Sequence, residues 1–294
     1  MRKRAKFAEF SKWLDQRLNR KRGATSELAK YLGVNISAVS RMRSGLREPH
    51  ASELKLLADY FGEPLPKEFW IERLDERKSM FAAKSILAFG DSLTWGVNTY
   101  NDLRHDFENR WPNVLAVGLS NKARVYEEGM NGRTTVFPDP TTTADRNGAV
   151  ALPILLTTHQ PLDLVIIMLG TNDIKFANRC TAFDASLGME RLIKLVKGHD
   201  FSRGYKVPQI LIMSPPPLVK TKDEWFNELW GHAFAESKRF AEHYSRVATE
   251  QGVHFFDAGS VAHASDVDGG HLDAENTVAI GKALVPMVKK ILEI

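Results

Sequence analysis

From residue 84 onward, short apolar runs alternate with longer segments of helical periodicity, and this alternation constrains the fold more than any other feature of the sequence. The apolar runs predict strands at 85–89, 124–128, 162–169, 209–214 and 253–257. The segments between and after them predict helices at 108–120, 148–159, 183–198, 226–250 and 273–293. Such alternation is typical of an α/β domain with an open parallel sheet and helices on both faces.

Polar motifs follow the ends of these strands, where ligands bind in open parallel sheets. The first strand runs directly into Gly90, Asp91 and Ser92. Glycine permits a tight exit, and the first turn of a following helix offers free N–H groups beside a serine hydroxyl. A nucleophile is one interpretation of Ser92; a simple helix N-cap is the other.

Two further loops contain glycine and amide residues. Gly132 lies in the loop after the second predicted strand, and Asn172 lies in the loop after the third. Acyl transfer places negative charge on a carbonyl oxygen, so it needs hydrogen-bond donors that already point there. A main-chain N–H beside Gly132 and the amide of Asn172 fit that need, although a turn glycine and a capping asparagine are the commoner roles of such residues.

The loop at 266–273 contains Asp268 three residues before His271. At this offset, a carboxylate can hold one ring nitrogen while the other accepts the proton of a hydroxyl. A competing interpretation, which we favour less, groups His263 and Asp266 with these two residues as metal ligands.

The N-terminal part of the chain is strongly basic. Residues 1–47 contain 13 Lys and Arg against 3 Asp and Glu, whereas residues 79–294 contain 22 against 25. This charge density favours a polyanionic partner for the N-terminal segment.

The same segment has the pattern of four short helices. Apolar spacing and capping residues predict them at 6–20, 26–33, 36–44 and 51–61, with a tight glycine turn between the second and the third. Two short helices joined in this way predict a helix-turn-helix; a helical bundle used for oligomerisation is the alternative. We therefore expect three parts: a DNA-binding domain at 1–65, a linker with a connecting helix at 66–83, and an α/β domain at 84–294.

Residues 6–62 resemble the lambda-repressor-like helix-turn-helix family through Glu27-Leu28-Ala29, Leu32-Gly33-Val34 and Val39-Ser40-Arg41. The resemblance implies double-stranded DNA as partner, with the second helix of the pair in the major groove. It implies base-edge positions at Ser37, Ala38, Ser40 and Arg41, and phosphate contacts at Thr25, Arg43 and Arg47. The family often has Glu where this chain has Arg43, so we expect an internal ion pair to be lost.

Residues 84–294 resemble the SGNH (GDSL) hydrolase family through four blocks: Gly90-Asp91-Ser92-Leu93, Gly132, Gly170-Thr171-Asn172-Asp173 and Asp268-Gly269-Gly270-His271. The resemblance implies a three-layer α/β/α sandwich with a five-stranded parallel sheet, flavodoxin-like in arrangement. This part of the chain is similar above all to bacterial arylesterases and acyltransferases of the family. The resemblance implies Ser92 as nucleophile, His271 as base, Asp268 as its orienter, and an oxyanion hole from Ser92, Gly132 and Asn172. It implies no metal and no organic cofactor.

The predicted reaction is two-step acyl transfer from a small ester to water or another small nucleophile. Residues expected to shape the substrate pocket are Asp91, Leu93, Trp95 and Pro216, with Trp225 and Trp230 as further candidates for narrowing it around a short acyl group. The resemblance also implies a homo-oligomer. Two functions stay open: an esterase fused to a DNA-binding domain, or a transcription regulator whose hydrolase-like domain senses or consumes a small ester.

The sequence also bears on location. Cys180 is the single cysteine, so the chain cannot form an intrachain disulfide. This agrees with a protein of a reducing compartment. The longest apolar run, 164–169, is too short to span a bilayer. The basic N-terminus lacks the apolar segment of an export signal. We therefore expect a cytoplasmic protein without membrane contact.

Overall fold

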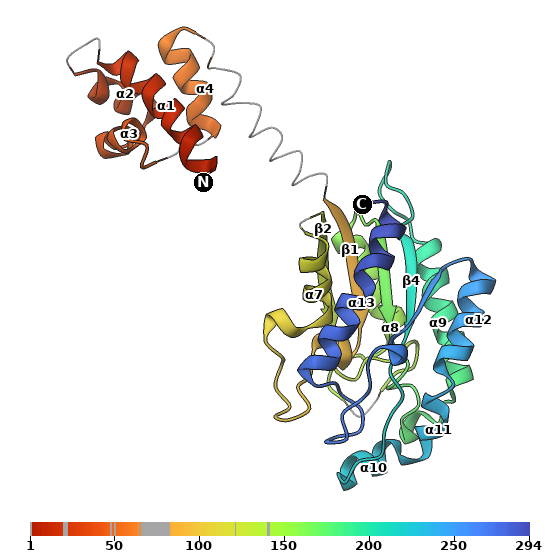
Figure 1. Ribbon diagram of the computed structural model, residues 1–294. Helices are drawn as coiled ribbons and strands as arrows, with labels where there is room; N and C mark the ends of the chain where they lie inside the picture. The colour runs from red at the N-terminus through yellow and green to blue at the C-terminus, as the bar shows by residue number, and fades with distance from the viewer. Residues whose placement is uncertain are drawn as a thin grey trace. The chain divides into compact units, whose positions relative to one another are not determined.

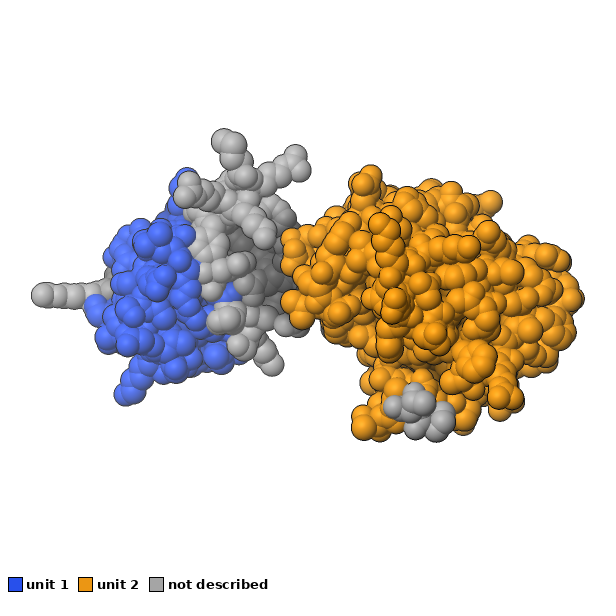
Figure 2. Space-filling model, turned by 90° about the horizontal axis from the view of Figure 1, so that it is seen from below, with its two compact units in different colours: residues 1–81 blue, residues 82–294 orange. Residues whose placement is uncertain are grey.

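The computed structural model comprises two compact units, Met1–Phe81 and Ala82–Ile294, coloured separately in Figure 2. It describes residues 2–19, 23–47, 49, 51–63, 65, 83–120, 122–139 and 142–294. The connecting helix predicted within 66–83 lies outside the described residues.

The first unit is a small all-helical domain (Figure 1). Its helices are α1 (Arg2–Leu18), α2 (Ala24–Leu32), α3 (Ile36–Arg43) and α4 (Ala51–Phe61). Leu14, Leu28, Val39 and Leu57 are fully buried and pack together in one core. The predicted helix-turn-helix is therefore present as the pair α2 and α3.

Local chemistry sets the turn between α2 and α3. Gly33 ends α2 in the left-handed conformation, at φ 65°, which glycine adopts without steric cost. Asn35 then caps α3, because its side-chain oxygen accepts a hydrogen bond of 3.0 Å from the N–H of Ser37. The tight turn orients α3 with its apolar residues Val39 and Met42 in the core and its polar residues outward.

The second unit is built on a five-stranded sheet (Figure 1). The strands are β1 (Lys84–Gly90), β2 (Ala123–Gly129), β3 (Leu164–Met168), β4 (Gln209–Ser214) and β5 (His254–Asp257). They are all parallel, in the order β2-β1-β3-β4-β5. The chain crosses from one side of β1 to the other after β2, so the carboxyl ends of β1 and β3 form the switch point at which ligands bind in such sheets.

Alternate residues of the central strands enter two different cores. Leu87 and Ile167 belong to one core, with α8 (Gly148–His159), α9 (Ala182–Lys197) and α12 (Phe240–Gln251). Ile86 and Ile166 belong to the other, with α7 (Trp111–Gly118) and α13 (Ala274–Leu292). Successive strand residues point to opposite faces of the sheet. A strand whose residues are all apolar is therefore covered by other elements on both faces. The predicted three-layer α/β/α sandwich is confirmed.

The helix predicted at 226–250 is wrong as a single element. The chain forms α10 (Glu224–Trp230), a short 3-10 turn (Gly231–Ala233), α11 (Phe234–Ser237) and then α12. The hydroxyl of Ser237 donates to the carbonyl of Phe234 and accepts from the N–H of Leu218, which ties the break to a neighbouring loop. Apolar spacing continues through the break, so periodicity alone does not detect it.

Two smaller observations complete the fold. The helix predicted at 108–120 begins only at Trp111, with Pro112 in its first turn, where the missing N–H of proline costs nothing. Within the described residues, no helix is long and apolar enough to cross a membrane.

Candidate active site

Ser92 is the first residue of a one-turn helix, α6 (Ser92–Trp95), that begins directly after β1. Asp91 caps this helix, because its carboxylate accepts a hydrogen bond of 2.9 Å from the N–H of Leu93. In the first turn of a helix the N–H groups have no intrahelical acceptor. The hydroxyl of Ser92 therefore lies beside main-chain donors.

Two glycines let α6 lie close to the sheet. Gly90 and Gly129 are the last residues of β1 and β2 and pair with each other. A Cβ atom on Gly129 would lie 2.1 Å from the backbone nitrogen of Trp95, and one on Gly90 would lie 2.0 Å from Oγ1 of Thr94. Any larger side chain at these positions would displace the turn that carries Ser92.

Ser92, His271 and Asp268 form a hydrogen-bonded chain. Nε2 of His271 lies 3.0 Å from Oγ of Ser92, and Nδ1 lies 2.8 Å from Oδ2 of Asp268. Oδ1 of Asp268 accepts hydrogen bonds of 2.9 Å from the N–H groups of Gly270 and His271. Burial acts to raise the pKa of Asp268, but its bonds with His271 and these N–H groups lower it overall, so the carboxylate stays charged.

The loop that holds Asp268 and His271 is fastened at both ends. The N–H of Ser265 donates to the carbonyl of His271 at 2.8 Å, which closes the loop on itself. The hydroxyl of Thr221 donates to the carbonyl of Val267 at 2.7 Å and links the loop to the segment before α10. The imidazole is therefore positioned by main-chain bonds as well as by Asp268.

Gly132 and Asn172 line the same cavity as Ser92 and His271. Gly132 has φ 78°, a conformation that favours glycine. The side-chain amide of Asn172 donates to the carbonyl of Arg133 at 3.1 Å and to Oδ2 of Asp91 at 3.3 Å. These bonds hold the amide at the carboxyl edge of the sheet, next to the turn of Ser92.

Two charged groups, Asp91 and Arg133, lie buried close to the turn of Ser92; sequence analysis expected Asp91 in the substrate pocket and gave Arg133 no role. Burial raises the pKa of Asp91 to about 6, while the hydrogen bond from Leu93 and the charges of His271 and Arg133 oppose the shift. Burial lowers the pKa of Arg133 to about 10. Its guanidinium donates to the carbonyl of Gly90 at 2.8 Å, at the end of β1.

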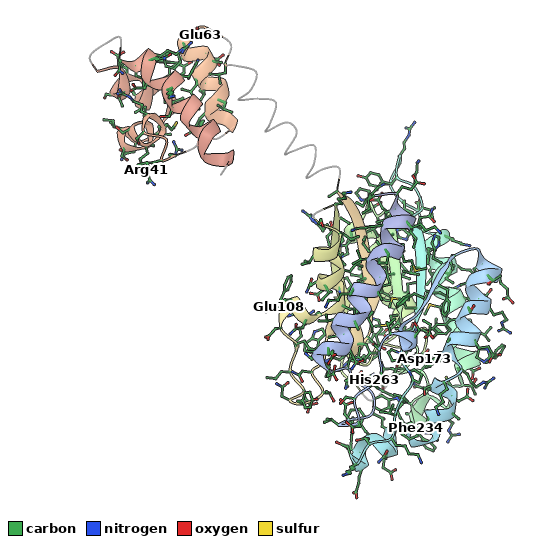
Figure 3. All side chains as sticks on the ribbon, viewed as in Figure 1. Arg41, Glu63, Glu108, Asp173, Phe234 and His263 are labelled. Carbon is green, nitrogen blue, oxygen red and sulfur yellow. The ribbon has the colours of Figure 1, made fainter. Side chains whose placement is uncertain are left out.

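Asp173 is a second fully buried carboxylate at this edge. It accepts hydrogen bonds from the N–H of Thr135, at 3.1 Å, and from the hydroxyl of the same residue. Burial raises the pKa of Asp173 to about 7, although these bonds oppose the shift. Figure 3 shows Asp173 within the second unit. The sequence pattern Arg133-Thr134-Thr135 lies where the partner of Asp173 is found, but it does not reveal that Thr135 binds this carboxylate.

The cavity has a volume of about 530 Å³. Trp225, Phe226 and Trp230 of α10 line it together with Ser92 and His271. The rings of Phe226 and Trp230 stack with centroids 5.1 Å apart, and the Phe226 ring meets the imidazole of His271 edge to face at 5.9 Å. An aromatic wall of this kind suits an apolar ester of limited size.

Four residues expected in the pocket lie elsewhere. Asp91 is 1 % exposed and caps α6, and Leu93 belongs to the core that contains residues of α13. Trp95 lies under the guanidinium of Arg104, and Pro216 is buried. None of the four lines the cavity. Trp225 and Trp230, the further candidates, both line it.

The predicted base-edge residues share the outer side of α3. Ser37, Ser40 and Arg41 are exposed, and Ala38 is partly buried. Figure 3 shows the side chain of Arg41 projecting away from the unit. This is the geometry that a helix needs to enter the major groove.

The predicted phosphate contacts are engaged within the protein. Arg43 pairs with Asp15 at 2.5 Å and donates to Oγ1 of Thr25 at 2.9 Å. Arg47 pairs with the buried carboxylate of Glu53 at 2.8 Å. We expected Arg43 to cost the domain an internal ion pair; this expectation is wrong, because Asp15 on α1 supplies the partner.

The alternative of a metal site has little support in the geometry. Asp268 and His271 bond to each other and to Ser92, whereas the side chain of His263 is exposed. The part of the chain that the structure describes contains no group of three or more His, Cys, Asp or Glu residues arranged to hold a metal ion.

Family comparisons agree with both units. Residues 88–277 match the GDSL-like Lipase/Acylhydrolase family, and residues 16–67 match a family described as Helix-turn-helix. No curated protein matches the chain.

Solved structures resemble the second unit. A carbohydrate acetylesterase family member from Sinorhizobium meliloti is 46% identical, with a TM-score of 0.71, and the match covers 72% of this chain and 100% of that one. An aryl esterase from M. smegmatis is 43% identical (TM-score 0.69; 71% and 100% covered). A second carbohydrate acetylesterase from Sinorhizobium meliloti is 37% identical (TM-score 0.68; 71% and 99% covered).

The fold and the serine site define the second unit as a serine hydrolase with an α/β sandwich. The chain belongs to the GDSL-like lipase/acylhydrolase (SGNH) family and contains an esterase domain of that family, preceded by a helix-turn-helix DNA-binding domain.

Proposed function

We propose that this protein hydrolyses short-chain acyl esters through Ser92, His271 and Asp268, and that it binds double-stranded DNA through its first unit. The observation that carries the esterase proposal is the continuous chain of bonds, 3.0 Å from serine to imidazole and 2.8 Å from imidazole to carboxylate, at the wall of the cavity. A similar arrangement on unrelated folds performs acyl transfer.

In the proposed reaction, His271 takes the proton of Ser92 as the hydroxyl attacks the ester carbonyl. The N–H groups of Ser92 and Gly132 and the amide of Asn172 stabilise the oxyanion. His271 then protonates the leaving alcohol, and the acyl-enzyme passes its acyl group to water or to another small nucleophile. The aromatic wall of α10 and the likeness to acetylesterases and an aryl esterase support acetyl as the acyl group.

Turnover of p-nitrophenyl acetate by the purified chain tests this proposal. We expect Ser92→Ala or His271→Ala to lower kcat by several orders of magnitude, about 10⁴-fold or more. His263→Ala is the matched control, because this exposed histidine lies outside the cavity and should leave the rate unchanged. Wild-type turnover in the Ser92→Ala chain would refute the assignment.

A regulator that senses or consumes a small ester is the second candidate function. The exposed polar side of α3 favours it, since an esterase needs no such surface. A gel shift with DNA that flanks the gene of this protein, repeated over a range of salt concentrations, tests it. We expect binding that weakens steeply with salt, because phosphate contacts release counterions. Absence of binding at low salt would refute the DNA-binding part.

We also propose that the protein acts as a homo-oligomer in the cytoplasm and that the boundary between its domains lies in the segment 66–83. The single cysteine and the absence of a membrane-spanning helix among the described residues are compatible with that location.

A further inference from the structure

The outer side of α3 carries an apolar residue as well as polar ones. Ile36, in the first turn, is 52% exposed, and Ser37, Ser40 and Arg41 are exposed beside it. We call these four residues the α3 outer face. A single exposed isoleucine is ordinary on a protein surface. Its position is what matters here, because Ile36 opens the helix that a helix-turn-helix domain presents to the base edges.

Only one of the two arginines of α3 is available to a ligand. The guanidinium of Arg43 donates from Nε to Asp15 at 3.0 Å and from Nη1 to Thr25 at 2.9 Å. No hydrogen bond or ion pair joins the Arg41 guanidinium to another of the described residues, and its side chain projects outward (Figure 3). Arg41 therefore keeps its full set of donors for a planar acceptor pair.

We propose that the α3 outer face reads a thymine through its methyl group and a guanine through its N7 and O6 atoms. Ile36 offers the apolar contact that the thymine methyl requires, and Arg41 offers the bidentate donor pair that fits guanine. The hydroxyls of Ser37 and Ser40 are compatible with either base edge. This inference rests on the proposed binding of DNA by the first unit.

The helix geometry also limits how far apart these two bases lie. Ile36 and Arg41 are five residues apart, which is a rise of about 7.5 Å along the helix axis. A helix parallel to the DNA axis would span about two base-pair steps of roughly 3.4 Å with that rise, and an inclined helix would span fewer. We therefore expect the guanine within about two or three base pairs of the thymine, depending on how the long arginine side chain extends.

The experiment begins with selection of bound duplexes from a random-sequence DNA pool by the full-length chain. Each thymine of a selected duplex is then replaced in turn by uracil, which lacks only the methyl group. We expect one such replacement to weaken binding about fourfold, the value of one buried methyl group. Replacement of a guanine two or three pairs away by 7-deazaguanine, which lacks the N7 acceptor, should weaken binding about tenfold.

Variants identify which side chain reads which base. Ile36→Ala should lose the uracil effect and keep the 7-deazaguanine effect, and Arg41→Gln should show the reverse. Leu46→Ala is the matched control: Leu46 is 71% exposed but lies beyond the end of α3, so it should keep both effects. Exposed side chains contribute little to the core, so these variants should fold.

The outcomes separate the inference from the function on which it rests. If duplexes bind but uracil has no effect at any position, or has the same effect in Ile36→Ala, the base-reading inference is overturned and DNA binding stands. If no duplex binds even at low salt, both are overturned.

Discussion

At the residue scale, the proposed active site depends on a carboxylate that does not line the cavity. Asp91 accepts bonds from the N–H of Leu93, at 2.9 Å, and from the amide of Asn172, at 3.3 Å. It thereby links the helix turn of the nucleophile to the amide donor of the proposed oxyanion hole. The carbonyl of Arg133 holds the same amide from another direction. The orientation of Asn172 is thus set before substrate binds, as electrostatic stabilisation of an oxyanion requires.

Replacement of the amide tests this role. We expect Asn172→Ala to lower kcat for p-nitrophenyl acetate about 10²- to 10³-fold, as loss of one oxyanion donor does in other hydrolases. KM should change much less, since the donor acts mainly on charge that develops in the transition state. Steady-state kinetics gives both constants; a raised KM with unchanged kcat would instead indicate a role in substrate binding.

The buried carboxylate of Asp173 should make stability depend on pH. Burial raises its pKa from 3.8 to about 7, so between about pH 4 and pH 7 the folded chain holds a proton that the unfolded chain has released. The contribution of this group to stability therefore falls as pH rises through that window. The substitution Asp173→Asn removes the titrating carboxyl group, and with it this contribution to the pH dependence of stability.

Urea unfolding at several pH values measures the effect. We expect the free energy of unfolding of the wild type, minus that of Asp173→Asn, to decrease from pH 4 to pH 7 and to stay level above pH 7. Asp91 is present in both proteins, so its titration largely cancels in this difference. If the free energies of unfolding of the two proteins changed in parallel with pH, the carboxyl of Asp173 would not retain its proton in the folded chain.

At the scale of elements, the position of α6 depends on the two glycines that end β1 and β2. In Gly129→Ala the added Cβ atom would lie 2.1 Å from the nitrogen of Trp95 and 2.6 Å from its Cα atom. These are backbone atoms, so α6 itself must move. We expect kcat to fall about 10²-fold, the cost of a displacement near 1 Å at a reacting group.

The matched control for this substitution is Gly231→Ala. Its Cβ atom would meet nothing within 4 Å, and its φ of −55° suits any residue. Its activity should stay at the wild-type level. Circular dichroism shows whether Gly129→Ala still folds, and a folded Gly129→Ala chain with full activity would show that the turn tolerates the shift.

The elements also show how far the sequence could predict this structure. The strands were predictable because β1 and β3 are apolar on both faces, which leaves a run without alternation. The contact between Asp268 and His271 was predictable because it is local, joining residues three positions apart. The break before α12 was not predictable from apolar spacing, and the bond between Ser237 and Leu218 that accompanies it joins residues 19 positions apart.

Tertiary contacts also explain two expectations that the structure contradicts, one in each unit. Trp95 follows the nucleophile closely, but Arg104 covers its ring instead of a substrate. The ion pair of Arg43 with Asp15 joins residues 28 positions apart, so no local pattern reveals it. Sequence patterns indicated the proposed reacting groups; the surroundings of those groups depend on tertiary contacts.

At the scale of the whole molecule, each unit has its own core, and we propose a separate site in each. The core of the first unit contains residues between Phe10 and Leu65, and every residue of the two cores of the second unit lies beyond residue 85. The residues that line the cavity all belong to the second unit. The two activities should therefore fail separately when one core is damaged.

Leu28→Ala and Ile167→Ala test this independence in the full-length chain. Both side chains are fully buried, one in each unit, and such truncations cost about 2–5 kcal/mol. A domain as small as the first unit has a low free energy of unfolding. Leu28→Ala should therefore abolish DNA binding on warming while turnover of p-nitrophenyl acetate persists. Ile167→Ala should lower the temperature at which turnover is lost and leave DNA binding intact. Loss of both activities in either variant would instead show that the two units stabilise each other.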